Sequence, residues 1–395
     1  MAAHPIQALI EAGVAQGAAP GFCAAVRTPR GGTQLFQAGV RGVADPAPMD
    51  DGTIFWIASC TKAIVSAAAL ELVAEGRLDL DEPVGRLLPA LARPKVLTGF
   101  DAAGAPVLRP AAQPLTLRSL LSHTSGLAYD FNCAEVVRYL EHHGLSLVTA
   151  GGLGLPLMFE PGDAWRYGVG IDVAGLLIEA ATGESLGEVL ERMVFGPLGM
   201  ADTTFDPSPE QNARRATLHA RLPDGSLMPL DPMPAMPPTL RGGGGLVSTA
   251  ADYLRFLDAI LDGGGGVFSP QTIAHLRTPH LRGRSLGALK SVLPQMSNDY
   301  EPLAGAEKAW TLGFLQSLEP ADGAREPGSL SWAGLANCYY WADPATGVAG
   351  VLFAQLLPFA DPQVLAVFEA FERAVYAEAR PPAAAAGLST AAADA

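Results

Sequence analysis

The sequence lacks the features that would direct a chain to a membrane or to nucleic acid. It has no uninterrupted apolar run of about 18 residues, so we expect no transmembrane span. The N-terminal stretch has no basic start and carries Glu11, which predicts a short helix and not a signal peptide. Only 26 Lys and Arg stand against 40 Asp and Glu, and the basic residues form no cluster. We therefore expect a soluble, cytoplasmic protein that acts on a small, uncharged or mildly polar molecule, with no nucleic acid and no membrane as partner.

Cysteine is scarce as well. The four cysteines are widely separated and have neither the spacing of a metal site nor the density of a disulfide framework: Cys23, Cys60, Cys133 and Cys338. We expect free thiols in a reducing compartment, and neither a metal nor another cofactor. The sequence gives no indication of the oligomeric state.

Lysine is the rarest charged residue. Only four of the 395 residues are lysines, and one of them, Lys62, lies in an apolar stretch, residues 54–76. Apolar residues fill so many positions after Lys62 that no polar stripe at helical period remains, which predicts a helix buried on most sides. Burying a lone ammonium costs on the order of several kcal/mol, so we expect this amine to have a function.

Ser59 lies three residues before Lys62. If Ser59 begins the helix, the two residues are one turn apart on the same face, where the hydroxyl and the amine can touch. The helix N-terminus would also favour an oxyanion at this point. The pair predicts an activated nucleophile with its base. The alternative is that Ser59 only caps the helix, while the Lys62 side chain extends to water.

Strands are predicted at both ends of the chain, with helices between them. The predicted strands cover residues 22–27, 34–40, 310–318, 330–336, 338–342 and 347–357. Beyond the 59–76 helix, the predicted helices cover residues 116–122, 133–142, 172–181, 185–193, 249–261 (with a capping box of Thr249 and Asp252) and 362–379. This order predicts an α/β (α+β) fold, in which an antiparallel sheet built from both termini carries helices on its faces and a mainly helical domain is inserted.

The domain boundaries follow from this order. Residues 1–76 and 239–380 are predicted to form a discontinuous sheet domain, residues 77–238 the inserted helical domain, and residues 381–395 a disordered tail. The helix with Ser59 would run along the junction, where clefts for small molecules are common. The irregular residues 128–160 and 268–305 are expected to line that cleft.

Five motifs occur in the order seen in serine β-lactamase-like proteins. They are SCTK at 59–62, LLSHTSGL at 120–127, Tyr167 after PGDAW, GGGGLVSTAADYLRF at 242–256, and WAG at 332–334. Over about residues 5–380 the chain resembles the family VIII carboxylesterases, which are similar to class C β-lactamases and penicillin-binding proteins. The resemblance implies a β-lactamase/transpeptidase-like fold.

The resemblance also implies roles for the matching positions. Ser59 would be the nucleophile, Lys62 its partner, and Tyr167 the base that later protonates the leaving alcohol. The backbone N–H groups of Ser59 and Leu335 would form the oxyanion hole. Substrate-binding positions would be Trp332, Ala333, Gly334 and Val169.

Two positions depart from the class C pattern. Tyr167 is followed by Gly168 and Val169 where class C enzymes have Tyr-x-Asn, so the amide that would hold a β-lactam side chain is missing. Trp332 replaces the lysine of Lys-Thr-Gly, which removes the cation for a substrate carboxylate and leaves an apolar wall. Both changes favour neutral esters.

The sequence therefore predicts a cofactor-free serine carboxylesterase that hydrolyses small or short-chain carboxylic esters through an acyl-enzyme on Ser59. Three alternatives remain at this point. The chain could be a β-lactamase or D-amino peptidase type of amide hydrolase, an acyltransferase that uses the same acyl-enzyme, or a catalytically silent scaffold of the same fold.

Several other features are expected to be structural. Residues 183–187 match a Gly-x-Ser-x-Gly elbow, but a predicted helix precedes Ser185, which favours a helix cap. His123 is expected to be a turn residue that shapes the cleft. Cys60 is expected to pack in the core, and the glycines at 242–245 to form a turn.

Overall fold

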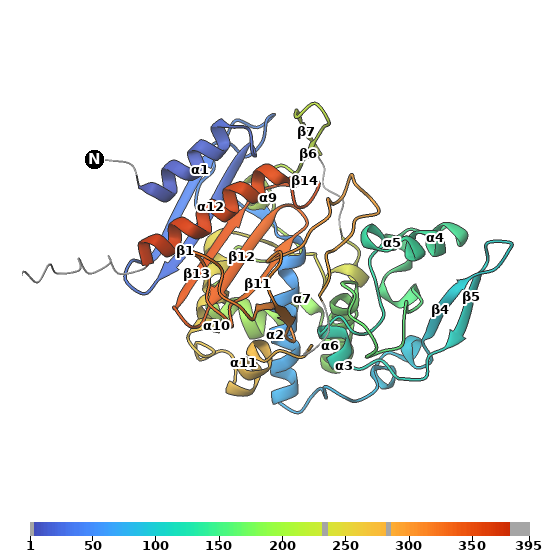
Figure 1. Cartoon of the computed structure of the whole chain (residues 1–395). Helices are drawn as coiled ribbons and strands as arrows, with labels where there is room; N and C mark the ends of the chain where they lie inside the picture. The colour runs from blue at the N-terminus through green and yellow to red at the C-terminus, as the bar shows by residue number, and fades with distance from the viewer. Residues whose placement is uncertain (1–3, 231–235, 282–285, 380–395) are drawn as a thin grey trace, which may run out of the picture.

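A seven-stranded antiparallel sheet joins the two ends of the chain in the computed structural model, which describes residues 4–230, 236–281 and 286–379. The strand order is β2-β1-β13-β12-β11-β10-β9 (Figure 1). N-terminal β1 pairs with C-terminal β13, from Cys23 opposite Phe353 to Arg27 opposite Ala349. The strands are β1 Gly21–Thr28, β2 Gly32–Gly39, β9 Lys308–Trp310, β10 Leu315–Ser317, β11 Leu330–Gly334, β12 Cys338–Asp343 and β13 Val348–Phe353.

Both faces of this sheet are buried, which explains why its central strands are apolar at nearly every position. On β1, Cys23 and Ala25 belong to one apolar cluster, whereas Phe22, Ala24 and Val26 belong to a second cluster on the other face. Helices α1 (Pro5–Ala15) and α12 (Pro362–Ala379) cover the second cluster, in front of the sheet in Figure 1. Helix α10 (Ala250–Leu261) packs on the opposite face.

Helix α2 (Thr61–Ala74) lies between the sheet-bearing part and the helical part of the chain. Eleven of its residues are buried, and it packs against α6 and α11. Residues 116–182 carry much of the helical part and lie to the right of α2 in Figure 1. The remaining helices are α3 Leu117–Leu121, α4 Ala134–His142, α5 Leu147–Ala150, α6 Gly170–Thr182, α7 Leu186–Leu190, α8 Gly196–Leu198, α9 Pro209–Ala213 and α11 Pro270–Arg277, with a π-helical turn at Glu191–Phe195.

Most predicted elements are confirmed. The N-terminal hairpin, the late strands 330–336 and 338–342, and the last helix appear within two residues of the predicted bounds. One apolar cluster runs through both the sheet-bearing and the helical parts, so the boundaries at 76/77 and 238/239 stay predictions. The predicted disordered tail at 381–395 lies outside the described residues. Among the described residues, no helix is long and apolar enough to cross a membrane.

Three local predictions were wrong, and one hairpin was missed. Residues 310–318 form two strands, because Thr311 N–H bonds Phe314 O and turns the chain. Strand 347–357 breaks after Phe353, and its end, β14 (Leu356–Leu357), pairs with another sheet. The capping box at Thr249 is only half formed, since the Asp252 carboxylate instead accepts from Asp202 N–H. A hairpin in the helical part, β4 (Lys95–Phe100) and β5 (Pro106–Pro110), was not predicted.

Of two further small sheets, the first holds the segment just before Ser59. Strand β3 (Phe55–Trp56) pairs with β8 (Val247–Ser248), which places the chain before Ser59 beside the glycines at 242–245. The second sheet contains β6 (His219–Arg221), β7 (Leu227–Pro229) and β14. The pairing of β3 with β8 thus fixes the position of the chain segment that leads into Ser59.

Gly334, at the end of β11, touches the chain just before Ser59. A Cβ atom at this position would lie 2.2 Å from the Ile57 carbonyl oxygen, so the strand passes too close for any side chain.

We expect Gly334→Ala to destabilise the fold by about 1–3 kcal/mol, because either β11 or the turn before Ser59 must move. Urea unfolding midpoints would measure this. Gly287→Ala is the matched control, because nothing lies within 4 Å of the Cβ atom that it adds. Equal stability of the two variants would contradict the prediction.

Candidate active site

Ser59 lies in a short turn at the start of α2. The turn is a 3₁₀ helix, Ala58–Cys60, and α2 begins at Thr61, so Ser59 precedes the α-helix instead of beginning it. Ala58 has φ 43°, in the left-handed region that residues with a side chain rarely adopt. Cys60 is fully buried, and burial raises the pKa of its thiol well above its usual value, which confirms that it packs in the core.

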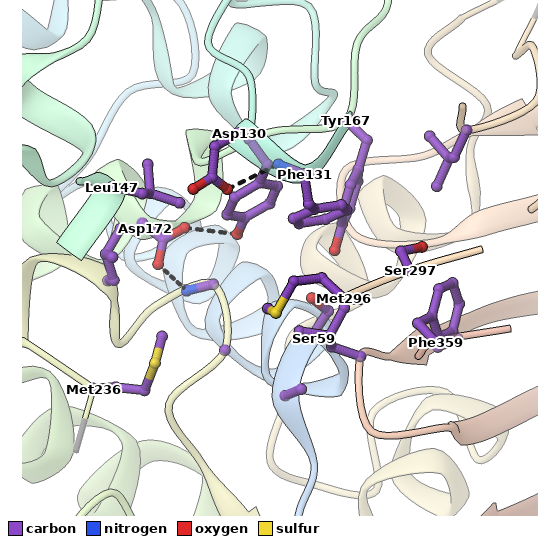
Figure 2. A pocket seen from close by; sticks show the side chains of 18 of the residues that line it. Ser59, Asp130, Phe131, Leu147, Tyr167, Asp172, Met236, Met296, Ser297 and Phe359 are labelled. Atoms are coloured by element: carbon purple, nitrogen blue, oxygen red, sulfur yellow. Dashed lines mark hydrogen bonds between the residues drawn. The ribbon is translucent and has the colours of Figure 1, made fainter. Parts of the chain in front are cut away.

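Lys62 is 1% exposed and is held by three oxygen atoms. Its Nζ lies 3.1 Å from Ser59 Oγ, 2.8 Å from the Tyr129 hydroxyl and 2.5 Å from Gly243 O. Asp172 closes a ring behind these contacts. Its carboxylate accepts from the Tyr129 hydroxyl at 2.9 Å and from Gly243 N–H at 2.7 Å (Figure 2).

The direction of each hydrogen bond in this ring follows from counting protons. The Tyr129 hydroxyl gives its one proton to Asp172, so it accepts from Lys62. Gly243 O can only accept. Two N–H groups of the amine therefore donate to Tyr129 and Gly243, and its third bonding direction points to Ser59 Oγ. An ammonium donates to the serine there, whereas a neutral amine accepts the serine proton.

Burial controls the acid–base behaviour of the ring. Burial raises the pKa of Asp172 to about 6, while the charge of Lys62 and the bonds from Tyr129 and Gly243 lower it. Burial, together with Asp172, raises the pKa of Tyr129 well above its usual value, so Tyr129 stays a neutral donor at physiological pH.

Sequence reasoning missed Tyr129, Asp172 and Gly243 as members of the site. Asp172 carries a usable signal, because it is a lone acid in the apolar stretch GVGIDVAG, just as Lys62 is a lone base in its own stretch. Gly243 was assigned only to a turn. Gly243 takes part only through its backbone N–H and carbonyl, which every residue type except proline also has, so its identity gives no signal.

Tyr167 lies in the turn before α6, as predicted. The Trp332 indole N–H donates to the Tyr167 hydroxyl at 3.2 Å, and Lys62 Nζ lies 4.9 Å from the centre of the Tyr167 ring. Gly168 permits this turn, because a Cβ atom there would lie 2.1 Å from Leu127 O. Trp332 was predicted only as an apolar wall, but its N–H also gives the phenol oxygen a polar partner.

One cavity of about 220 Å³ brings Ser59 and Tyr167 together. Its wall is mostly apolar, and no Lys, Arg or His of the described chain lines it. Parts of the predicted ranges 128–160 and 268–305 contribute, as expected. The lining residues are Trp56, Ala58, Ser59, Tyr129, Asp130, Phe131, Leu147, Val148, Tyr167, Asp172, Met236, Leu240, Gly243, Gly244, Leu289, Met296, Ser297, Trp332, Ala333, Leu335 and Phe359.

Two of the predicted substrate-binding residues do not line this cavity. Val169 is fully buried at the start of α6, where it packs beside Gly152. Gly334 instead lets β11 approach Ile57. Leu335 does line the cavity, and neither its N–H nor that of Ser59 donates a hydrogen bond in the described part of the chain.

The residues expected to be structural are so. Ser185 caps α7 in a capping box with Glu188. His123 is 1% exposed with φ 57°, and its ring packs 4.8 Å from that of Tyr167 and 4.9 Å from that of Trp310. Burial and the charge of Lys62 lower the pKa of His123 well below its usual value, so it is a neutral ring. The four cysteines are free thiols, and the described residues contain no cluster of three His, Cys, Asp or Glu that could hold a metal ion.

Known proteins are similar to this chain over most of its length. The family model described as Beta-lactamase matches residues 6–373. Monacolin J acid methylbutanoyltransferase of Aspergillus terreus is 34% identical over 345 residues, which cover 84% of each chain. Lovastatin esterase of Penicillium rubens is 30% identical and is matched over 78% of this chain and 81% of its own. The solved structure of the LovD6 mutant of simvastatin synthase from Aspergillus terreus superposes with TM-score 0.83 at 32% identity, covering 95% of this chain and 94% of that one.

The raised pKa of Asp172 predicts a specific effect of pH on stability. In the folded chain the carboxyl keeps its proton up to about pH 6, whereas in the unfolded chain it loses it near pH 4. Unfolding within this window releases a proton, so this group lowers stability as pH rises through it. Asp172→Asn cannot titrate, and its free energy of unfolding relative to the parent should rise by about 3 kcal/mol between pH 4 and 7. Urea unfolding across this range would measure the difference, and parallel pH profiles would contradict it.

Proposed function

The chain belongs to the beta-lactamase family, and from this premise we propose that it forms an acyl-enzyme on Ser59 and passes the acyl group to an alcohol, with water as the competing acceptor. Its relatives are acyltransferases and esterases, and the chain is an enzyme of the same serine hydrolase type. The observation that carries the proposal is that Ser59, whose Oγ lies 3.1 Å from Lys62 Nζ, shares an apolar cavity with Tyr167.

We propose acyl transfer, and not hydrolysis, as the main activity because of the relatives. The family VIII resemblance favoured an esterase, and the lovastatin esterase supports that second candidate. The methylbutanoyltransferase is more similar, at 34% identity, and its name describes transfer of a short branched acyl group to monacolin J acid. Both activities use the same first half-reaction, so they differ only in the acceptor.

In the first half-reaction, Ser59 Oγ attacks the ester carbonyl while its proton passes to the Tyr167 oxygen, the base of this step. Tyr167 then gives the proton to the leaving alkoxide as the C–O bond breaks. The Trp332 N–H and the positive charge of Lys62 support negative charge on the Tyr167 oxygen. The N–H groups of Ser59 and Leu335 would bind the oxyanion.

In the second half-reaction the acceptor hydroxyl gives its proton to Tyr167 and attacks the acyl carbon. The Ser59–carbon bond breaks, and Tyr167 returns the proton to Ser59 Oγ. Water follows the same steps and yields the free acid. The ring around Lys62 is unchanged at the end, so the cycle needs no cofactor.

The lining of the cavity supports uncharged acyl groups over β-lactams. A β-lactam carries a carboxylate, and no basic side chain of the described chain lines the cavity to bind it. Trp332 stands where class C enzymes have a lysine. A β-lactamase or D-amino peptidase activity is therefore the weaker reading.

Product analysis would test transfer against hydrolysis. With p-nitrophenyl butyrate as donor and butanol as acceptor, we expect butyl butyrate to exceed butyric acid, because the apolar wall binds the alcohol and excludes water. Nitrophenol release reports acylation, and chromatography reports the two products. Butyric acid alone would make the protein an esterase.

The same assay on Ser59→Ala is the control, and that variant should release no nitrophenol above background. A fluorophosphonate should add to Ser59 of the parent chain, as seen by intact mass. Absence of the adduct, under conditions that label a control esterase, would favour a silent scaffold.

Two substitutions to phenylalanine separate the roles of Tyr167 and its partner. Tyr167→Phe removes the proton carrier and should lower kcat by about 10²–10⁴. Trp332→Phe keeps an aromatic ring but removes the N–H that donates to Tyr167, and should lower kcat by about tenfold with little change in KM. Circular dichroism checks that both variants fold. Unchanged turnover of Tyr167→Phe would move the base role to Lys62.

A further inference from the structure

Asp130 brings a second carboxylate to the cavity that holds Ser59. It follows Tyr129 directly and begins the 3₁₀ turn Asp130–Asn132, and it lines the cavity. Figure 2 shows Asp130 and Asp172 on one side of the cavity, and Ser297 and Phe359 on the other.

The two carboxylates are satisfied to different degrees. Both oxygens of Asp172 have donors, Tyr129 and Gly243, and the side chain belongs to the Lys62 ring. Asp130 Oδ1 accepts from Phe131 N–H at 2.8 Å. No Lys, Arg or His of the described chain forms a salt bridge with Asp130.

Leaving a half-buried carboxylate without a cation costs free energy. Burial raises the pKa of Asp130, which records this cost, and backbone N–H groups offset only part of it. The mechanism proposed above does not use Asp130. A hydrogen-bond donor on a bound molecule would replace the water that the Asp130 carboxylate has lost.

The rest of the cavity adds no positive charge to balance Asp130. Its remaining wall consists of apolar side chains, glycines, two serines, two tyrosines and the Asp172 carboxylate. Lys62 does not line the cavity, and its amine is held behind Ser59 by Ser59 Oγ, the Tyr129 hydroxyl and Gly243 O. A bound carboxylate would therefore meet like charge without a partner, whereas an ammonium or a hydroxyl would find an acceptor.

We propose that Asp130 selects the acyl acceptor, and that the preferred acceptor is an apolar alcohol with a second hydrogen-bond donor, an ammonium or a hydroxyl, and without a carboxylate. This inference rests on the proposed acyl transfer. The second donor binds Asp130 while the reacting hydroxyl attacks the acyl group on Ser59. The charge preference is opposite to that of a relative whose named acceptor is an acid.

Three acceptors of equal chain length would test this. Aminohexanol, hexanediol and hydroxyhexanoate compete with water for the butyryl enzyme formed from p-nitrophenyl butyrate, near neutral pH. The ratio of O-acyl ester to butyric acid is measured for each. We expect the ratio for aminohexanol to exceed that for hydroxyhexanoate by about tenfold or more, the equivalent of one charge-assisted contact of roughly 1.4 kcal/mol. Hexanediol should fall between them.

Asp130→Asn keeps the shape of the side chain and removes its charge. It should bring the ratios for aminohexanol and hydroxyhexanoate to within about twofold of each other, and Asp130→Ala, a second variant in case the first folds poorly, should do the same. Asp163→Asn, which changes an exposed carboxylate outside the cavity, is the matched control and should keep the tenfold preference.

The outcomes separate this inference from the proposed function. No nitrophenol release by the parent chain would overturn acyl-enzyme formation itself. Nitrophenol release with equal use of the three acceptors, or a preference that Asp130→Asn leaves unchanged, would overturn selection by Asp130 and leave the acyl-enzyme standing. A preference that is lost in both Asp130 variants and kept in Asp163→Asn would support it.

Discussion

The structure depends on how one buried amine is held. An unpartnered ammonium at Lys62 would cost several kcal/mol of a net stability that is only about 5–15 kcal/mol in most proteins. Its three partners come from the turn before α2, the segment before α4 and the glycines before β8, and Asp172 on α6 closes the ring. The ring can form only when the sheet and the helical part are both in place. The contacts that hold the amine therefore also fix the walls of the cavity.

Lys62, which bonds Ser59, and Tyr167, which shares the cavity with Ser59, lie in different surroundings, and the proposed chemistry would be divided between them. Lys62 is surrounded by oxygen atoms and by the carboxylate of Asp172, so its positive charge is balanced inside the ring. Tyr167 is surrounded by aromatic rings and receives one N–H from Trp332. Positive charge thus stays fixed beside the place where negative charge would develop on the phenol oxygen and on the acyl carbonyl. Such fixed charge needs no reorganisation during the reaction.

The sequence predicted the parts of the site that depend on local spacing. Ser59 and Lys62 lie one turn apart, and strands β1 and β2 were predicted to within two residues of their bounds. Tyr167 came from the resemblance to a family. The contacts of Tyr129, Asp172 and Gly243 could not be predicted, because they join residues more than 40 positions apart and one of them uses only backbone atoms. The same limit explains Gly334, since a close approach between β11 and Ile57 leaves no periodic pattern.

In the proposed reaction, what occupies the cavity would decide whether the acyl-enzyme ends as an ester or as an acid. An alcohol that buries roughly 150 Å² of apolar surface against this wall gains about 4 kcal/mol, close to a thousandfold in occupancy, although ordering the bound alcohol takes back part of that gain. One carboxylate at the wall has a smaller effect, about tenfold. In the proposed reaction, apolar contact would therefore let transfer outrun hydrolysis, and the charge of Asp130 would select among the alcohols. An acceptor that binds through both would also displace the water that would otherwise attack the acyl group, so selection of the acceptor and suppression of hydrolysis follow from the same wall.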